Sequence, residues 1–323
     1  MSLLYWLACS GCLPPSILPM NEPAALAVQS HTVEEASELL WQPELRPAWR
    51  DPTQEEKDAF NTLIPALTYY APSGELPAEL TGIAEQIGMH LERWEVAGQQ
   101  HFVLYEDVAS RRGTGAYLFA IGRPLERSWI LLQSPHAYFD MGTGWIGASL
   151  YFTPPSDSPA PVAFFTNSLH RYTTPTGARE KGEYNYADAC HNPEHLFQTA
   201  TLAAAKARRN TTVIQLHGFG GEGEGDPPPG TRMVISAGGQ SGVTDLSRKT
   251  AETLQASIGS EVLLYPDQVN VLGATTNVQA NELKGVRGAS FLHVELSAAQ
   301  RTELKEQPDR LALVGRGLFG GVK

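Results

Sequence analysis

Short apolar runs alternate along the chain with segments of helical period, and this alternation predicts an α/β fold. The predicted strands cover residues 91–96, 101–106, 115–121, 129–133, 161–166, 211–216, 232–236, 262–265 and 291–295. The predicted helices cover residues 78–89, 144–151, 192–208 and 246–258, with a last one from 297. Because strands and helices alternate in sequence, we expect a mostly parallel central sheet flanked by helices.

Three of the predicted strands carry a histidine or a glutamate at or near the carboxyl end. Trp129 to Gln133 is apolar without alternation, as in a strand covered on both faces, and it runs through Ser-Pro into His136. His217 follows the strand at 211–216, and Glu295 ends the strand at 291–295. Ligands and substrates of open α/β sheets bind beyond these carboxyl ends, so the three side chains are candidates for one site.

The chain is predicted to divide near residue 55. Residues 1–55 form an apolar N-terminal segment followed by an arm rich in Pro, Ala, Ser and Glu, with a short helix expected over 32–40. Thr53 and Glu56 are spaced as a capping box that starts a helix. Residues 56–323 are long enough to bury a self-sufficient core and are interpreted as a single catalytic domain.

The first twelve residues, MSLLYWLACSGC, leave two interpretations open. A short apolar run and small residues before Cys12 are typical of a bacterial lipoprotein signal, although no basic residue precedes Arg46. In that case the protein is periplasmic or lipid-anchored. Otherwise the segment is an apolar tail of a cytoplasmic protein.

Composition narrows the set of partners. Asp and Glu number 35 against 24 Lys and Arg, so no general electrostatic attraction to nucleic acid or anionic lipid is expected. Cys9, Cys12 and Cys190 allow at most one disulfide. No segment after the N-terminus is long and apolar enough to span a membrane. We therefore expect a small-molecule or peptide substrate, with the oligomeric state left open.

His136, Asp140 and His217 are the candidate metal ligands. Zinc accepts imidazole and carboxylate together, and a catalytic zinc site keeps about three protein ligands. The alternative is that His136 is an ordinary loop residue and that Asp140 caps the glycine-rich turn that follows it.

Glu295 is the candidate general base. A carboxylate in an apolar strand is costly to bury unless it is paired or has a raised pKa, and a raised pKa suits a base that activates water. The alternative is a solvent-facing residue of an edge strand. His293 lies on the same strand face and is interpreted as a structural neighbour.

Several polar residues are candidate substrate contacts. Asn167, His170 and Arg171 follow the strand at 161–166, and a fixed guanidinium there suits a substrate carboxylate. The alternative for Arg171 is an ordinary surface arginine. Arg301 is a weaker anion-binding candidate and His191 a polar site residue. Asn192, Pro193 and Glu194 predict a helix start, which places His191 before the helix and leaves His195 structural.

The segments SPHAYFDMGTG, TNSLHRY, ADACHNPEHLFQTAT, QLHGF and FLHVELSAAQR together resemble the N-formylglutamate amidohydrolase-like group of the zinc carboxypeptidase-like hydrolases. The resemblance covers residues 125 to 315 and implies a phosphorylase/hydrolase-like sheet with one zinc ion. It assigns the metal to His136, Asp140 and His217, the catalytic carboxylate to Glu295 and the substrate-carboxylate contact to Arg171. The pattern His-x-x-x-Asp departs from the His-x-x-Glu of the peptidases.

The expected function is therefore a zinc-dependent hydrolase of the amide bond in a carboxylate-bearing N-acyl amino acid or peptide. The competing expectation is a non-catalytic binding protein on the same scaffold. A thiol hydrolase using Cys190 with His191 is disfavoured, because adjacent residues rarely align for proton transfer.

Overall fold

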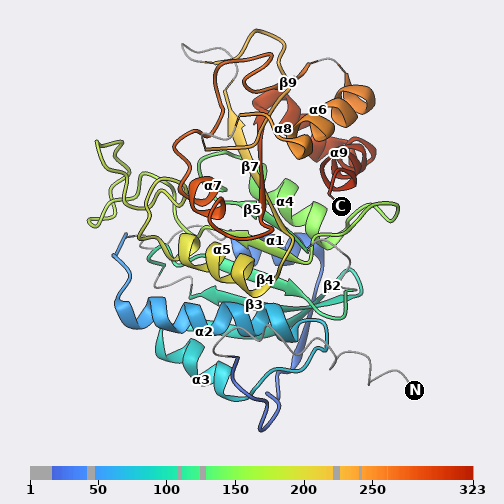
Figure 1. Cartoon of the computed structure of the whole chain (residues 1–323). Helices are drawn as coiled ribbons and strands as arrows, with labels where there is room; N and C mark the ends of the chain where they lie inside the picture. The colour runs from blue at the N-terminus through green and yellow to red at the C-terminus, as the bar shows by residue number, and fades with distance from the viewer. Residues whose placement is uncertain are drawn as a thin grey trace.

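A computed structural model describes residues 17–41, 48–107, 111–123, 129–220, 226–239, 242–259 and 261–322. Its centre is one ten-stranded sheet with the strand order β1-β2-β3-β4-β6-β5-β7-β10-β8-β9 (Figure 1). The strands are β1 (Val28–His31), β2 (Met89–Val96), β3 (Gln99–Glu106), β4 (Ala116–Ala120), β5 (Trp129–Ser134), β6 (Ala163–Thr166), β7 (Thr211–Phe219), β8 (Met233–Ser236), β9 (Val262–Leu264) and β10 (Ser290–Ser297).

The sheet is mixed with a parallel centre. Of the nine pairings between described strands, five are parallel and four are antiparallel. The run β6-β5-β7-β10 is parallel throughout, so the carboxyl ends of these four strands share one edge of the sheet. The predicted α/β class with a mostly parallel central sheet is confirmed.

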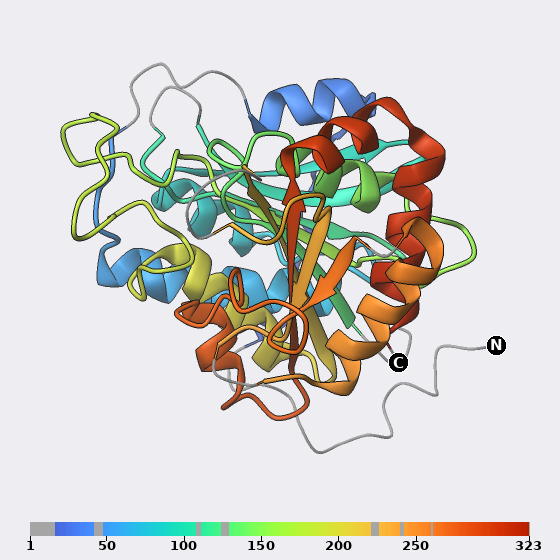
Figure 2. The same cartoon turned by 90° about the horizontal axis from the view of Figure 1, so that it is seen from above.

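Helices cover both faces of the sheet. They are α1 (Val33–Leu40), α2 (Gln54–Tyr70), α3 (Glu79–Gln86), α4 (Thr143–Phe152), α5 (Leu196–Ala207), α6 (Asp245–Ile258), α7 (Val278–Leu283), α8 (Ala298–Glu306) and α9 (Pro308–Gly320). One apolar cluster joins α1, α4, α6, α8 and α9 to one sheet face, and a second joins α2, α3, α5 and α7 to the other. Figure 2 shows the sheet edge-on between these two groups of helices. Among the described helices, none combines the length and apolarity needed to cross a membrane.

The two apolar clusters follow from the alternation of side chains along the strands. Leu131 and Val213 face the α5 side, whereas Leu132 and Ile214 face the α4 side. Both sets are fully buried, which explains why these strands read as continuous apolar runs rather than alternating ones.

Part of the segment predicted as a loosely packed arm belongs to the fold. Val28–His31 pairs with β2 at the edge of the sheet, and α1 buries Ala36 and Leu40 against the α4 side. Thr32 starts α1 with a capping box, as Thr53 does for α2, so both predicted helix starts are confirmed. Cys9, Cys12 and the rest of the first sixteen residues lie outside the described part of the chain.

Three predicted boundaries were wrong. The helix predicted over 78–89 ends at Gln86, because β2 begins at Met89. The helix predicted from Asn192 begins at Leu196, because His195 is its N-cap and Asn192 instead accepts a hydrogen bond from the Glu194 backbone within the preceding turn. Strand β7 continues past Leu216 to Phe219, since its pairing with β10 extends that far. His217 therefore lies inside the strand rather than after it.

Candidate active site

The candidate site lies at the carboxyl edge of β5, β7 and β10. Strand β5 ends at Ser134, and a turn then carries His136 over the edge. His217 on β7 lies opposite Glu295 on β10 in the parallel register. The His136 and His217 ring centroids are 5.0 Å apart. The three residues that the strand pattern placed at one edge are thus close together.

Asp140 lies between the two histidine rings. Its Oδ2 is 3.4 Å from Nδ1 of His217 and 3.7 Å from Nδ1 of His136. The turn holds this position, because the Asp140 backbone N–H donates to the His136 carbonyl and its own carbonyl accepts from Thr143. An Asp140 pointing away would have weakened the metal interpretation, and that condition is not met.

Asp188 holds the far side of the His136 ring. Nε2 of His136 lies 2.9 Å from Oδ1 of Asp188, and both side chains are buried. A carboxylate accepts only, so Nε2 carries a proton. Burial lowers the pKa of His136, but Cys190 and Asp188 outweigh it and raise that pKa well above its usual value. When the ring loses a proton, Nδ1 is therefore the bare nitrogen. This Nδ1 is buried without a hydrogen-bond partner. A buried unpaired nitrogen beside a carboxylate is an atom that fits a cation.

The second ring, His217, has partners on the side away from Asp140. Its Nε2 is 3.2 Å from Oε1 of Gln215 and 3.9 Å from Sγ of Cys190. Cys190 is buried, and the ring that it contacts is His217 rather than the adjacent His191. The geometry of a Cys190–His191 pair, already disfavoured from the sequence, is therefore not formed.

Glu295 is buried at the same edge. One oxygen, Oε1, is 3.4 Å from Nε2 of His293, and the other, Oε2, is buried without a partner. Burial raises the pKa of Glu295 to about 7. The predicted neighbour His293 is present, and burial holds its pKa well below the usual value, so it lies in the site as a neutral ring.

The charges of the cluster are mutually dependent. Burial lowers the pKa of His217, but Cys190 and Asp140 outweigh it and raise that pKa to about 9. Burial raises the pKa of Cys190, and the His136 and His217 rings then bring it down to about 6. Burial raises the pKa of Asp140, but the adjacent His136 and His217 rings outweigh it and hold that pKa below its usual range. The cluster therefore carries closely packed charges of both signs before any cation is added.

Arg171 lies beside the cluster on the loop after β6. It forms an ion pair with Oδ2 of Asp188, and its guanidinium lies 5.2 Å from the Phe139 ring centroid and 5.4 Å from that of Tyr172. Nδ1 of His191 contacts Oδ1 of the same aspartate at 3.1 Å. Arg171 and His191 thus both contact Asp188.

Asn167, His170 and Arg301 have local partners that differ from their predicted roles. The Asn167 amide is buried and bonds to the Ser168 and Ala187 backbones, and Nδ1 of His170 accepts from the Tyr172 backbone. Arg301 donates to the carbonyls of Met141, Phe219 and Leu296, packing over Gly218. These contacts hold the loops around the site, and the substrate-binding roles of the three residues stay predictions.

The donor set fits a small divalent cation. Zinc binds nitrogen and oxygen at about 2.0–2.2 Å, so tetrahedral donors lie roughly 3.4 Å apart. The two Nδ1 atoms lie at 3.4 and 3.7 Å from Oδ2 of Asp140, close to that spacing. Among the described residues, two groupings bring all their donor atoms within 4.8 Å of one another, namely His136 with Cys190 and His217, and His217 with His293 and Glu295, whereas the predicted set with Asp140 does not. Asp140 nevertheless faces Nδ1 of both rings, while Nε2 of His136 is paired with Asp188 and Nε2 of His217 with Gln215, so Asp140 remains our candidate for the third ligand.

Three residues of the site were not found from the sequence as functional groups. Gln215 and Gln133 are fully buried amides in otherwise apolar strands, and Asn277 caps α7. The sequence did contain one indication of this role. Gln215 is polar and lies two positions before His217, and strand alternation places both side chains on the same face of β7.

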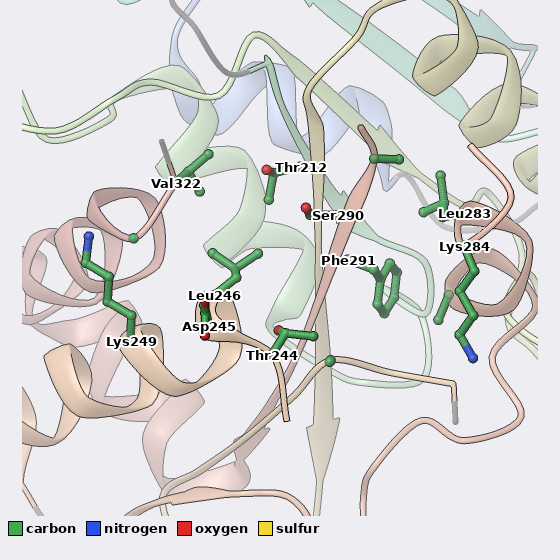
Figure 3. A pocket seen from close by; sticks show the side chains of 14 residues that line it. Thr212, Thr244, Asp245, Leu246, Lys249, Leu283, Lys284, Ser290, Phe291 and Val322 are labelled. Carbon is green, nitrogen blue, oxygen red and sulfur yellow. The ribbon is translucent and has the colours of Figure 1, made fainter. Parts of the chain in front are cut away.

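A cavity of about 500 Å³ lies at the other end of the same strands. Its lining includes Thr212 at the start of β7 and Ser290 at the start of β10 (Figure 3). Lys249 and Lys284 flank it from α6 and the end of α7. The cavity is therefore separate from the histidine cluster, and its position says nothing about the chemistry at the carboxyl edge.

No protein-family profile and no curated protein matches the sequence. Similar solved structures include a bacteriophage poly-gamma-glutamate hydrolase, 13% identical with a TM-score of 0.37, covering 61% of this chain and 84% of the other. Succinylglutamate desuccinylase from Chromobacterium violaceum is 12% identical with a TM-score of 0.39, covering 80% and 73%. A Zn-dependent exopeptidase from Parabacteroides distasonis is 10% identical with a TM-score of 0.34, covering 84% and 98%. At these values, the chemistry of the site has to be decided by its own geometry.

Proposed function

We propose that this protein is a metal-dependent amide hydrolase whose metal is held by His136, Asp140 and His217. The observation that carries the proposal is that Oδ2 of Asp140 lies 3.4 and 3.7 Å from Nδ1 of the two buried rings, close to the spacing of neighbouring donors around zinc. The unpaired Nδ1 of His136 supports it, because a buried polar atom without a partner is costly unless a ligand satisfies it.

A divalent cation in this position supplies Lewis-acid chemistry, polarising a carbonyl oxygen and acidifying water. The protein supplies the remaining parts. Asp188 orients the His136 ring by accepting its Nε2–H, and Gln215 does the same for His217. Both rings are thereby held with Nδ1 facing the donor cluster.

Glu295 is proposed as the general base. Its unpaired Oε2 is buried at the same edge as His217, and a pKa near 7 suits proton transfer at neutral pH. The carboxylate would take a proton from the attacking water and later give it to the leaving amine. His293 beside Oε1 fixes the carboxyl orientation.

Arg171 is proposed to bind the carboxylate of the substrate, an N-acyl amino acid or a peptide. Its guanidinium lies against the rings of both Phe139 and Tyr172, and the Arg171 side chain keeps a partly exposed edge, with an exposure of 18%. Because Asp188 occupies one amino group, the substrate would contact the remaining donors. The exposed Phe139 ring offers an apolar surface beside them.

The competing proposal is a non-catalytic binding protein. It is favoured by the 500 Å³ cavity at the amino edge, which is remote from the donor cluster. Metal content separates the two proposals. About one zinc per chain after dialysis against metal-free buffer, with hydrolysis of N-acyl amino acids or short peptides that a chelator abolishes, would support the hydrolase. If the protein takes up no zinc when zinc is added, the proposal of a non-catalytic binding protein is favoured.

A further inference from the structure

Behind His217 lies a closed network of buried side-chain amides. Gln215 on β7 donates through Nε2 to Oε1 of Gln133 at 2.8 Å and to Oε1 of Gln279 at 3.1 Å. Its own Oε1 accepts from Nδ2 of Asn277 at 2.8 Å and faces Nε2 of His217 at 3.2 Å. All three glutamines are fully buried. The orientation of Gln215 therefore depends on the groups at the ends of the network.

Two backbone groups fix that orientation independently. The Ala189 carbonyl accepts from Nε2 of Gln279, which turns Oε1 of Gln279 toward Gln215 and requires a donor there. The Ala280 backbone N–H donates to Oδ1 of Asn277, which turns Nδ2 of Asn277 toward Gln215 and requires an acceptor there. Both requirements place the Gln215 oxygen on the side of His217.

Gln133, at a third end of the network, requires the same orientation of the Gln215 amide. Gln133 donates through Nε2 to Thr201, whose hydroxyl donates to the Phe197 carbonyl. Oε1 of Gln133 is therefore left to accept from Gln215. Reversing the Gln215 amide would set donor against donor at Asn277 and acceptor against acceptor at Gln133 and Gln279, which is costly for fully buried groups.

We propose that Gln215 is a positioning residue that fixes the tautomer of His217. Facing an amide oxygen that can only accept, Nε2 of His217 keeps its proton, so when the ring is neutral or binds a cation, Nδ1 beside Asp140 is the bare nitrogen. Asp188 imposes the same tautomer on His136. The uncharged Gln215 amide thus fixes the tautomer of His217, as the Asp188 carboxylate fixes that of His136.

The expected effect of Gln215 on zinc affinity rests on the proposed function, whereas the hydrogen bonds that orient Gln215 do not. Its test compares Gln215→Leu with Gln133→Leu. Both remove a buried glutamine from the same network, but only Gln215 touches His217, and Gln279 and Asn277 still orient Gln215 in the control. Zinc affinity, measured by competition with a chelator, should fall 10- to 100-fold in Gln215→Leu and stay within about 3-fold in Gln133→Leu. Equal losses in the two variants would overturn the proposal.

A second measurement covers the case in which Gln215→Leu does not fold or the wild type binds no zinc. Long-range ¹H–¹⁵N correlation spectra of the zinc-free wild type at alkaline pH, where the ring is neutral, report its tautomer, and His217→Ala assigns the signal. A proton on Nε2 is expected, and a proton on Nδ1 would overturn the inference. Absence of zinc binding together with an Nε2 proton would reject the proposed function and keep the role of Gln215.

Discussion

Glu295 lies directly opposite His217 in the parallel pairing of β10 with β7, with His293 opposite Gln215 two residues earlier. Because alternate residues of a strand share a face, the register sets the proposed base beside the proposed metal ligand on one side of the sheet. The same register sets the neutral His293 ring 4.6 Å from His217. Strand pairing alone therefore assembles half of the site.

Glu295→Gln should keep the bound metal and lose turnover. Glutamine keeps the size of the side chain but cannot accept the proton, and general base catalysis contributes roughly 10²- to 10⁴-fold. Metal content by elemental analysis and kcat on the best substrate of an amide screen are the two measurements. Turnover within a few-fold of wild type would remove Glu295 from the reaction.

Asp140→Ala and Cys190→Ala should have opposite effects on metal content. Asp140 contacts both Nδ1 atoms, whereas Cys190 lies near Nε2 of His217, on the other side of that ring. We expect Asp140→Ala to release the metal and Cys190→Ala to retain both metal and hydrolysis. The reverse result would assign the third ligand to the thiolate, and lost hydrolysis with retained metal would revive a thiol mechanism.

His217→Ala should lower bound metal sharply, because two donors remain from a set of three. The matched control is His195→Ala, which removes a fully buried histidine that caps α5 and contacts the Trp49 ring. That variant should lose stability but keep its metal. Unchanged metal stoichiometry in His217→Ala would exclude the residue from the site.

Most of what could be predicted from the sequence came from the pattern of apolar strands and the polar residues at their ends. His136, His217 and Glu295 could be placed together because the carboxyl ends of adjacent parallel strands must meet, whatever the loops do. Asp140 could be identified as a candidate ligand, but the direction of its side chain could not be predicted, because its position depends on the hydrogen bonds of the turn that carries it. The three carbonyls that hold the Arg301 guanidinium come from separate segments, so its contacts could not be predicted, and its anion-binding role stays a prediction.

Contacts between segments that are distant in the chain could not be predicted from the sequence. Asp188 lies in a segment without regular structure, 52 residues after His136, and nothing in the local pattern ties the two. The role of Gln215 depends on α7 docking so that Asn277 and Gln279 reach it, which is a tertiary relationship. A glutamine in a buried strand predicts that some partner exists but does not say which.

Asp188→Asn should weaken metal binding about 10- to 100-fold, the usual effect of removing a carboxylate that orients a ligating histidine. The amide keeps an oxygen for Nε2 of His136 but loses the charge that holds Arg171. KM should therefore rise as well, through a less ordered guanidinium. Arg171→Lys is the comparison, since it should raise KM while leaving metal affinity within a few-fold. An Asp188→Asn protein with wild-type metal affinity would contradict the orienting role.

His101 gives the fold a dependence on pH that is independent of the site. It is fully buried against Tyr151, and burial, aided by the charge of Arg123, lowers the pKa of His101 to about 3. The unfolded chain binds a proton near pH 6.5, whereas the folded protein does so only near 3. Stability is therefore complete above pH 6.5 and falls as the pH drops from 6.5 toward 3. For this one group the loss between pH 7.5 and 5.5 is about 1.4 kcal/mol.

His101→Gln, which does not titrate, isolates this contribution. Urea unfolding at pH 7.5 and 5.5 gives the stability change with pH for each protein, and all other titrating groups cancel in the difference between them. The variant should lose about 1.4 kcal/mol less than wild type over this interval, even if it is less stable at both pH values. Identical pH dependence in the two proteins would mean that folding leaves the pKa of His101 near 6.5, and it would remove this residue as a source of pH dependence.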